Sequence, residues 1–167
     1  MEIYVADLGA YTAGELKGEW FDLNDYKDSN GLKEAVDAWK QEQGVEEIAV
    51  HDYNDCPAYD EFGEYPDWRE LFTYHTLYAK YGESFATWFE ICYHDCDCDK
   101  WKDKYNDDNA GEWESWEDLA QYLIDECGVL GDLPEQVKPY IDYSAFARDL
   151  RCNGEYIEQN GYFFRNY

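Results

Sequence analysis

The sequence has few basic residues for its length. It contains 13 Lys and Arg against 39 Asp and Glu, which gives a formal net charge of −26 over 167 residues. This excess is larger than solubility requires, and a compact protein that carries it repels itself. We therefore expect the acidic surface to be functional. Nucleic acids and anionic membranes would repel such a surface, so the expected partners are basic surfaces, mostly those of proteins that bind nucleic acid.

Long apolar runs are also missing. No stretch approaches the roughly 18 apolar residues that a membrane span needs, and residues 1–9 have neither the basic region nor the apolar core of a signal peptide. We therefore expect a cytoplasmic protein. In that compartment the six cysteines should be reduced thiols and not a disulfide framework.

Motifs of catalysis are absent as well. The sequence has no glycine-rich phosphate loop, no Gly-x-Ser-x-Gly motif and no cysteine-protease signature. Paired carboxylates are too abundant here to indicate glycosidase chemistry. We predict a binding protein that is not an enzyme, without catalytic residues and without a cofactor.

One cluster of residues could bind a metal ion. Cys92, His94, Cys96 and Cys98 supply three thiols and an imidazole, which is a suitable ligand set for zinc. The cluster lacks a Cys-x-x-Cys pair, and Cys92 falls on the apolar face of a predicted helix, where cysteine packs as a small hydrophobic residue. We predict no metal site, and a small zinc protein that uses these four residues is the alternative from another class.

Hydrophobic residues, in contrast, are plentiful, and their spacing predicts an α+β fold. Aromatic residues make up 19% of the chain and hydrophobic residues 45%, which provides a core and argues against disorder. Residues 1–58 form an expected N-terminal domain with three strands (3–8, 16–23 and 47–53) and one helix (32–41). Residues 59–103 form a central helical domain. Residues 104–167 form a C-terminal domain of helices and a small antiparallel sheet.

Local signals mark the ends of several elements. Ser29 or Asn30 can cap the first helix, and Ser115 can cap a later helix in a capping box with Asp118. Glycines are placed to end the helices, the first of them at Gly44. The Asn-Gly pair at residues 160–161 predicts a two-residue hairpin turn. Residues 9–14 are expected to form a glycine-containing turn, and residues 134–140 a short helix.

The negative charge is concentrated in two tracts that contain no Lys or Arg. The first acidic tract is residues 42–67, with nine acids, and the second is residues 107–135, with ten. Aromatic residues interrupt both tracts and tie them to a folded core. We predict that their carboxylates bind the partner: Glu42, Glu46, Glu47, Asp52, Asp55, Asp60, Glu61, Glu64, Asp67, Asp107, Asp108, Glu112, Glu114, Glu117, Asp118, Asp125, Glu126, Asp132 and Glu135.

Two interpretations of this charge are open from the residues alone. The surface could be merely solubilising, as in salt-adapted proteins. It could also imitate a nucleic-acid backbone. Duplex DNA carries about one charge per 1.7 Å of axis, so a net charge of −26 corresponds to roughly 44 Å of duplex.

Several stretches resemble one protein family. Residues 3–9 (IYVADLG) and 18–23 (GEWFDL), residues 47–53 (EIAVHDY) through Pro57, residues 133–135 (LPE) with 140–150 (YIDYSAFARDL), and residues 161–165 (GYFFR) are similar to the ArdA family of antirestriction proteins. The resemblance spans almost the full length. It is dense at both ends and thin between about residues 60 and 103, where the cysteine cluster matches no motif of the family.

The resemblance implies both a shape and a function. ArdA-like proteins are elongated, curved chains of three small domains that form homodimers through the C-terminal domain. They imitate bent duplex DNA and occupy the DNA-binding groove of type I restriction–modification enzymes, so no direct nucleic-acid binding is expected. The antirestriction motif corresponds to residues 123–141 and lies near the dimer contact. The implied interface residues are Leu133, Pro134, Tyr140, Ile141, Tyr143 and Phe146.

The function predicted from the sequence is therefore antirestriction by DNA mimicry. Its acidic carboxylates would stand in for phosphates on a restriction–modification methyltransferase or endonuclease complex. The alternative within the class of binding proteins is an acidic inhibitor of another DNA-binding protein.

Overall fold

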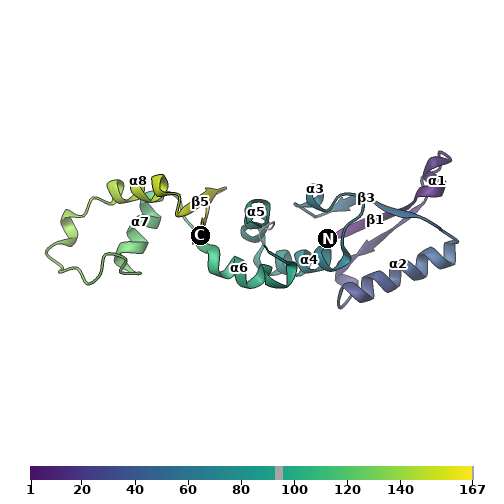
Figure 1. Ribbon diagram of the computed structural model, residues 1–167, viewed down its shortest axis with the longest axis horizontal. Coiled ribbons are helices and arrows are strands. Elements are labelled where there is room, and N and C mark those ends of the chain that lie inside the picture. The colour runs from purple at the N-terminus through teal and green to yellow at the C-terminus, as the bar shows by residue number, and fades with distance from the viewer. Residues whose placement is uncertain (93–95, 167) are drawn as a thin grey trace. The chain divides into compact units, whose positions relative to one another are not determined.

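The structure is a computed structural model that describes residues 1–92 and 96–166. The chain divides into two compact units, Met1–Trp101 (unit 1) and Lys102–Tyr167 (unit 2), and each has its own three-stranded antiparallel sheet (Figure 1). This is the α+β class that the sequence predicted. The division into three domains, with boundaries after residues 58 and 103, stays a prediction.

Unit 1 contains the three strands that the sequence predicted, in the order β2-β1-β3. Its elements in chain order are β1 (Glu2–Asp7), α1 (Leu8–Thr12), β2 (Gly18–Asp22), the 3-10 helix η1 (Leu23–Asp25), α2 (Ser29–Gln43), β3 (Ile48–Asn54), α3 (Tyr59–Phe62), α4 (Trp68–Tyr81), α5 (Glu83–Cys92) and the 3-10 helix η3 (Cys98–Lys100).

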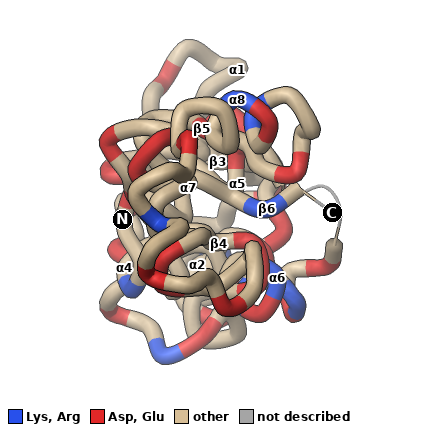
Figure 2. Tube along the Cα trace, turned by 90° about the vertical axis from the view of Figure 1, so that its left-hand side faces the viewer, with Lys and Arg blue, Asp and Glu red and all other residues tan. Residues whose placement is uncertain are grey.

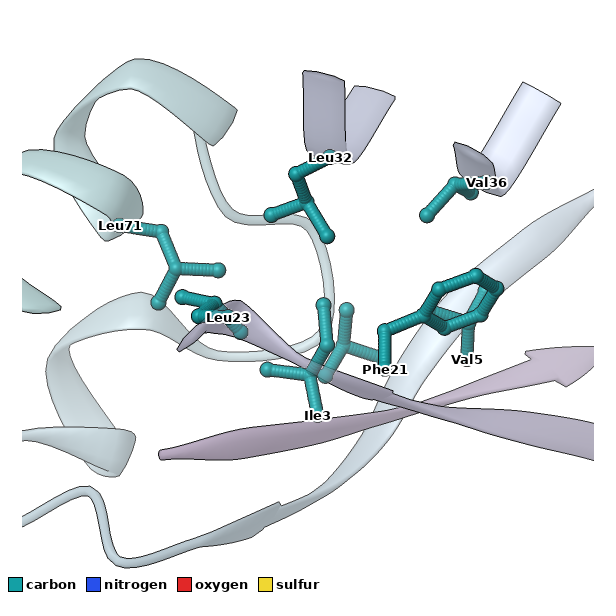
Figure 3. Close-up of a cluster of buried hydrophobic side chains, with 8 residues drawn as sticks. Ile3, Val5, Phe21, Leu23, Leu32, Val36 and Leu71 are labelled. Carbon is teal, nitrogen blue, oxygen red and sulfur yellow. The ribbon is translucent and has the colours of Figure 1, made fainter. Parts of the chain in front are cut away.

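One face of this sheet forms the first core of unit 1. Alternate residues of a strand point to the same face, so Ile3 and Val5 of β1 lie on one side together with Phe21 of β2. Leu32 of α2 and Leu71 of α4 pack against them (Figure 3). The central helix α4 therefore shares a core with the N-terminal sheet.

A second, aromatic core lies between α4 and α5. The ring of Tyr74 on α4 meets the ring of Phe89 on α5 with centroids 4.7 Å apart. Phe89 in turn lies 4.9 Å from Trp101, edge to face. All three side chains are buried. Such edge-to-face pairs add to the stabilisation that burial provides, and they give the helices of unit 1 a rigid support.

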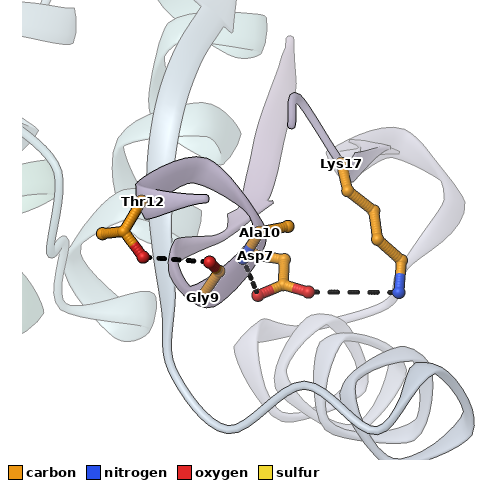
Figure 4. A network of polar contacts seen from close by, with 5 residues as sticks. All are labelled: Asp7, Gly9, Ala10, Thr12 and Lys17. Atoms are coloured by element: carbon orange, nitrogen blue, oxygen red, sulfur yellow. Dashed lines mark hydrogen bonds and ion pairs between the residues drawn. The ribbon is translucent and has the colours of Figure 1, made fainter. Parts of the chain in front are cut away.

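Residues 8–12 form a short helix, and the turn that was predicted there is wrong. The side chain of Asp7 caps α1 by accepting from the backbone N–H of Ala10 at 3.1 Å. Lys17 Nζ lies 3.9 Å from the same carboxylate, and the hydroxyl of Thr12 donates to the carbonyl of Gly9 (Figure 4). An N-terminal cap satisfies the first free N–H groups of a helix, and here it suffices for a single short turn of helix.

The sequence predicted Ser29 or Asn30 as the N-terminal cap of helix α2, but in the structure Asp28 is the cap. The Asp28 carboxylate accepts from the backbone N–H of Gly31 at 3.0 Å. At the other end the prediction is confirmed, because Gly44 adopts the left-handed conformation with φ 67° and closes the helix.

Unit 2 is built around a sheet in the order β4-β6-β5. Its elements are α6 (Trp101–Asp108), β4 (Asn109–Glu112), α7 (Trp116–Asp125), the 3-10 helix η4 (Lys138–Tyr140), α8 (Tyr143–Asn153), β5 (Tyr156–Gln159) and β6 (Tyr162–Arg165). Its core joins α7, α8 and β6 through Leu119, Leu123, Leu150 and Phe163.

Most local signals in unit 2 are confirmed. The Ser115 side chain accepts from the backbone N–H of Asp118 at 3.1 Å, as the capping box predicted. Asn160 and Gly161 both have positive φ, 55° and 82°, which fits a type I′ turn between β5 and β6. The helix predicted over residues 134–140 is reduced to the 3-10 turn η4. Within the described residues, no helix has the length and apolar character needed to cross a membrane.

His75 on α4 is buried, and its protonation should weaken unit 1. Burial lowers the pKa of His75 below its ordinary value of 6.5, and the positive amino terminus acts in the same direction. A depressed histidine pKa means that the unfolded chain binds the proton better. The neutral His75 side chain therefore contributes to the free energy of unfolding above about pH 6.5. This contribution is lost as the pH falls below that value, by at most about 1.4 kcal/mol per pH unit.

We expect the variant His75→Gln to lose less stability than the wild type between pH 7.5 and pH 5.5. Chemical unfolding at both pH values measures the difference, with His51→Gln in the same unit as the control. Identical pH dependence in the wild type and His75→Gln would contradict the buried, neutral state of this side chain.

Candidate functional site

The carboxylates of the first acidic tract line the surface of unit 1. They extend from the end of α2 along β3 and α3 to the start of α4, and all nine are exposed. Figure 2 shows how few basic positions lie among the acidic ones along the chain. Four of these acids lie in helices or strands (Glu42, Asp52, Asp60 and Glu61), and the other five lie in the segments that connect them.

Some carboxylates of the first tract also accept hydrogen bonds from the backbone of this chain. Asp67 caps α4 and accepts from the backbone N–H groups of Arg69 and Glu70 at 2.8 and 3.1 Å. Asp52 accepts from the N–H of Tyr53. Six others have no side-chain hydrogen bond or ion pair with any described residue: Glu42, Glu46, Glu47, Asp55, Asp60 and Glu64.

The second acidic tract runs from the end of α6 through β4 and α7 to the segment after α7 in unit 2. Nine of its ten acids are exposed. Asp118 belongs to the capping box, Asp125 accepts from the hydroxyl of Tyr143 at 3.0 Å, and Glu135 pairs with Lys138 at 2.7 Å. The others have no described side-chain partner: Asp107, Glu112, Glu114, Glu117, Glu126 and Asp132.

Helix α7 carries its negative charge in a way that stability does not favour. Glu117 and Asp118 lie in its first turn, where the helix dipole stabilises carboxylates, but Asp125 lies in its last turn, with Glu126 directly after it. No basic residue lies in that last turn. Like charges at a C-terminal end are unfavourable, so a function other than stability accounts better for these two acids.

Asp108 does not belong to the partner-binding surface, and its assignment from the sequence is corrected here. Its side chain is 0% exposed, and its carboxylate lies 2.7 Å from Lys104 Nζ, one helical turn earlier on α6. A buried and paired carboxylate presents no charge to a partner. The sequence held a signal for this pair, because an acid four residues after a lysine shares its helix face.

Removing Lys104 should destabilise unit 2. The variant Lys104→Met leaves the Asp108 carboxylate buried without its cation, which typically costs about 2–3 kcal/mol. Denaturant unfolding should show that loss, and Lys102→Met, at an exposed position on the same helix, should change stability by less than about 0.5 kcal/mol. Equal stability of the two variants would mean that Asp108 does not depend on this ion pair.

The implied interface residues of unit 2 divide into exposed and structural ones. Tyr140 is 86% exposed and Pro134 is also exposed, whereas Leu133 and Ile141 are half-buried. Phe146 packs against the core of unit 2. The half-buried Tyr143 donates its hydroxyl to Asp125.

The sequence interpretation missed three further apolar side chains in this segment. Val129, Leu130 and Val137 are 50%, 47% and 44% exposed, close in sequence to the exposed Tyr140. The signal was the Val-Leu pair directly after Gly128, beyond the end of α7. Large apolar side chains that gather at a surface mark interaction sites.

No metal centre is found in the part of the chain that is described. Among residues 1–92 and 96–166, no group of three or more His, Cys, Asp and Glu side chains is placed to hold a metal ion. His94 lies outside the described residues, so the alternative of a zinc site at Cys92, His94, Cys96 and Cys98 is not tested. The buried thiol of Cys56 has its pKa raised to about 12 by burial, so it stays protonated at neutral pH and is a poor nucleophile.

Comparison with known proteins gave one family. The family model described as antirestriction protein (ArdA) matches residues 3–164, which is nearly the whole chain. A comparison with curated proteins gave no match.

Proposed function

This chain belongs to the ArdA family of antirestriction proteins, and we propose that it blocks restriction by imitating duplex DNA. The observation that carries the proposal is the exposure of 18 carboxylates in two tracts without a single Lys or Arg. Such a surface offers a basic cleft what a DNA backbone offers, which is closely spaced negative charge at fixed positions.

The proposed target is the DNA-binding cleft of a type I restriction–modification methyltransferase core. A cleft that binds duplex DNA is lined by Lys and Arg, and it attracts an acidic protein by the same long-range field. The proposed phosphate substitutes are the twelve exposed carboxylates that form no side-chain hydrogen bond or ion pair with a described residue, because none of the described cations pairs with them. Asp67 and Asp118 contribute charge but also have a structural role, because Asp67 caps α4 and Asp118 accepts from the hydroxyl of Ser115, the cap of α7.

Plating of unmodified phage tests this function. Expression of the chain in a host with a type I restriction system should raise the plating efficiency of unmodified phage by at least about 100-fold. Hosts with several different type I systems should be tried, with a host that lacks restriction as the control. No gain in any of these restricting hosts would contradict the proposed target.

We also propose a homodimer that forms through unit 2. The exposed apolar side chains of residues 129–140 support it, because an apolar surface next to so many carboxylates is best explained by a partner that covers it. Two acidic chains repel each other, so the apolar contact has to outweigh that repulsion.

Tyr140→Asp should convert the dimer to a monomer. It places a charge in the proposed apolar contact and adds to the repulsion between chains. Sedimentation measurements at micromolar concentration should show one chain per particle for this variant and two for the wild type. Tyr59→Asp, at a 52% exposed tyrosine of unit 1, should stay dimeric. A wild type that is monomeric at all concentrations would rule out the dimer.

A further inference from the structure

The sheet of unit 1 has a second face, opposite the core that it forms with α2 and α4. Side chains alternate between the faces of a strand, so the neighbours of the core residues point away from α2 and α4. The register places Tyr4 of β1 between Trp20 of β2 and Asp52 of β3. Trp20 is 45% exposed and Asp52 is exposed. This outer face therefore presents a large aromatic side chain beside a carboxylate.

The Tyr4 ring lies over Gly18 of the neighbouring strand β2 and beside the Trp20 ring. The Tyr4 and Trp20 rings lie with centroids 5.3 Å apart and tilted by 52°. A Cβ atom on Gly18 would come within 2.6 Å of the Tyr4 ring and 2.5 Å of the carbonyl oxygen of Val5. Only glycine leaves room there, and the Tyr4 ring occupies the space beside it. We call Tyr4 and Trp20 the aromatic platform.

Glu2 and Asp22 lie on the same face, two residues along their strands from Tyr4 and Trp20. Glu2 is paired with Asp22 on one side and with Asn54 on the other. The Asn54 amide donates to Glu2 at 2.8 Å. The backbone N–H of Asn24 donates to Asp22 and lowers the pKa of that carboxyl, which keeps it ionised.

None of the three carboxylates on this face has an ion-pair partner among the described residues. Glu2 and Asp22 also lie outside the two acidic tracts. The outer face thus combines rings that a flat cation can stack on with carboxylates that form no ion pair with a described residue, although the positive amino terminus helps to lower the pKa of Asp22.

We propose that this outer face binds arginine side chains of the partner protein, with Trp20 as the anchor. A guanidinium group is planar, stacks on an indole ring and donates to carboxylates at the same time, which an ammonium group does less well. The inference rests on the proposed function, because arginines line the DNA-binding clefts in which the chain would act. It also extends that function, because the Trp20 ring would add a contact that imitation of a phosphate backbone does not supply.

The alternative occupant, single-stranded nucleic acid, also stacks on exposed aromatic rings. It needs a positively charged groove to follow its backbone. Here the rings are surrounded by Glu2, Asp22 and Asp52, and the chain carries a net charge of −26. Charge complementarity therefore favours arginine.

The affinity of the full-length chain for the type I methyltransferase core tests this inference. Trp20→Ala should raise the Kd roughly 10- to 30-fold, because exposed tryptophans at interfaces are frequent binding hot spots. Trp20→Phe keeps a ring and should stay within about 3-fold of the wild type. Tyr11→Ala removes another exposed ring of unit 1, 55% exposed and outside the two acidic tracts, and should have no effect beyond about 2-fold. Unfolding midpoints of all variants verify that each is folded.

The outcomes separate this inference from the proposed function. Wild-type affinity in Trp20→Ala, together with weaker binding after loss of acidic-tract carboxylates, would overturn the arginine site and leave DNA mimicry standing. A wild type that does not bind the core at all would overturn the proposed function.

A peptide titration tests the platform without the enzyme. The Trp20 indole N–H resonance, identified by its absence in Trp20→Phe, should shift more with hexa-arginine than with hexalysine of equal charge. Equal shifts would overturn guanidinium stacking. A shift of this resonance with a single-stranded oligonucleotide would overturn the choice of occupant.

Discussion

Loss of five unpaired carboxylates from the first acidic tract should weaken binding to the methyltransferase core roughly 10- to 100-fold and lower phage plating efficiency accordingly. The variant replaces Glu42, Glu46, Glu47 and Glu64 by Gln and Asp60 by Asn. Each change keeps the size of the side chain and removes only its charge. Each exposed charge contributes little alone, but the five act together on one basic surface.

A matched variant separates the position of the charge from its total. Glu15, Glu34, Asp25, Asp37 and Asp97 are exposed acids of unit 1 outside the tracts. Their replacement by Gln or Asn removes the same five charges and should change binding less than about 3-fold. Both variants should be at least as stable as the wild type, because both lower its self-repulsion. Equal losses of binding in the two variants would show that only net charge matters and would contradict a patterned imitation of DNA.

Affinity for the methyltransferase core should also fall steeply with salt. Between 50 and 200 mM NaCl we expect the Kd to rise roughly 10- to 100-fold, because the Debye length shrinks through about 10 Å at 0.1 M and counterions compete for the basic cleft. Titrations at four salt concentrations give the slope of log Kd against log salt concentration.

Two further salt titrations serve as controls. The variant that lacks five carboxylates of the first tract should show a shallower slope than the wild type, since fewer ion pairs form. The homodimer, which is proposed to rest on apolar contacts, should not weaken with salt and should tighten as repulsion between the chains is screened. A Kd for the core that stays constant across this salt range would contradict an electrostatic mechanism.

The parts of the fold that were predicted correctly depend on short-range signals. Ser115 and Asp118 form a capping box within four residues, and the Asn160-Gly161 turn requires only two residues with positive φ. Such signals act through the local backbone and need no knowledge of the rest of the chain. Asp28, the observed cap of α2, lies one residue before the predicted Ser29, and local signals commonly place a helix end only to within one or two residues.

The parts that could not be predicted depend on contacts between distant residues. The position of Trp20 follows from its pairing with Tyr4 on the sheet face opposite α2 and α4, and the irregular register between Tyr4 and Val5 is not visible in the sequence. The burial of Asp108 depends on tertiary packing around α6. For the candidate site, the sequence located the two acidic tracts, but only the structure separates capping and paired carboxylates from unpaired ones.

The most direct measurement of the central claim is competition with DNA on the methyltransferase core. A labelled duplex that carries the recognition sequence is bound to the core, and the full-length chain is titrated in. Mimicry predicts complete displacement, with a half-effective concentration that rises in proportion to the concentration of DNA, and no complex that contains both. A complex of core, duplex and this chain together, or a plateau at which DNA stays bound, would contradict the claim.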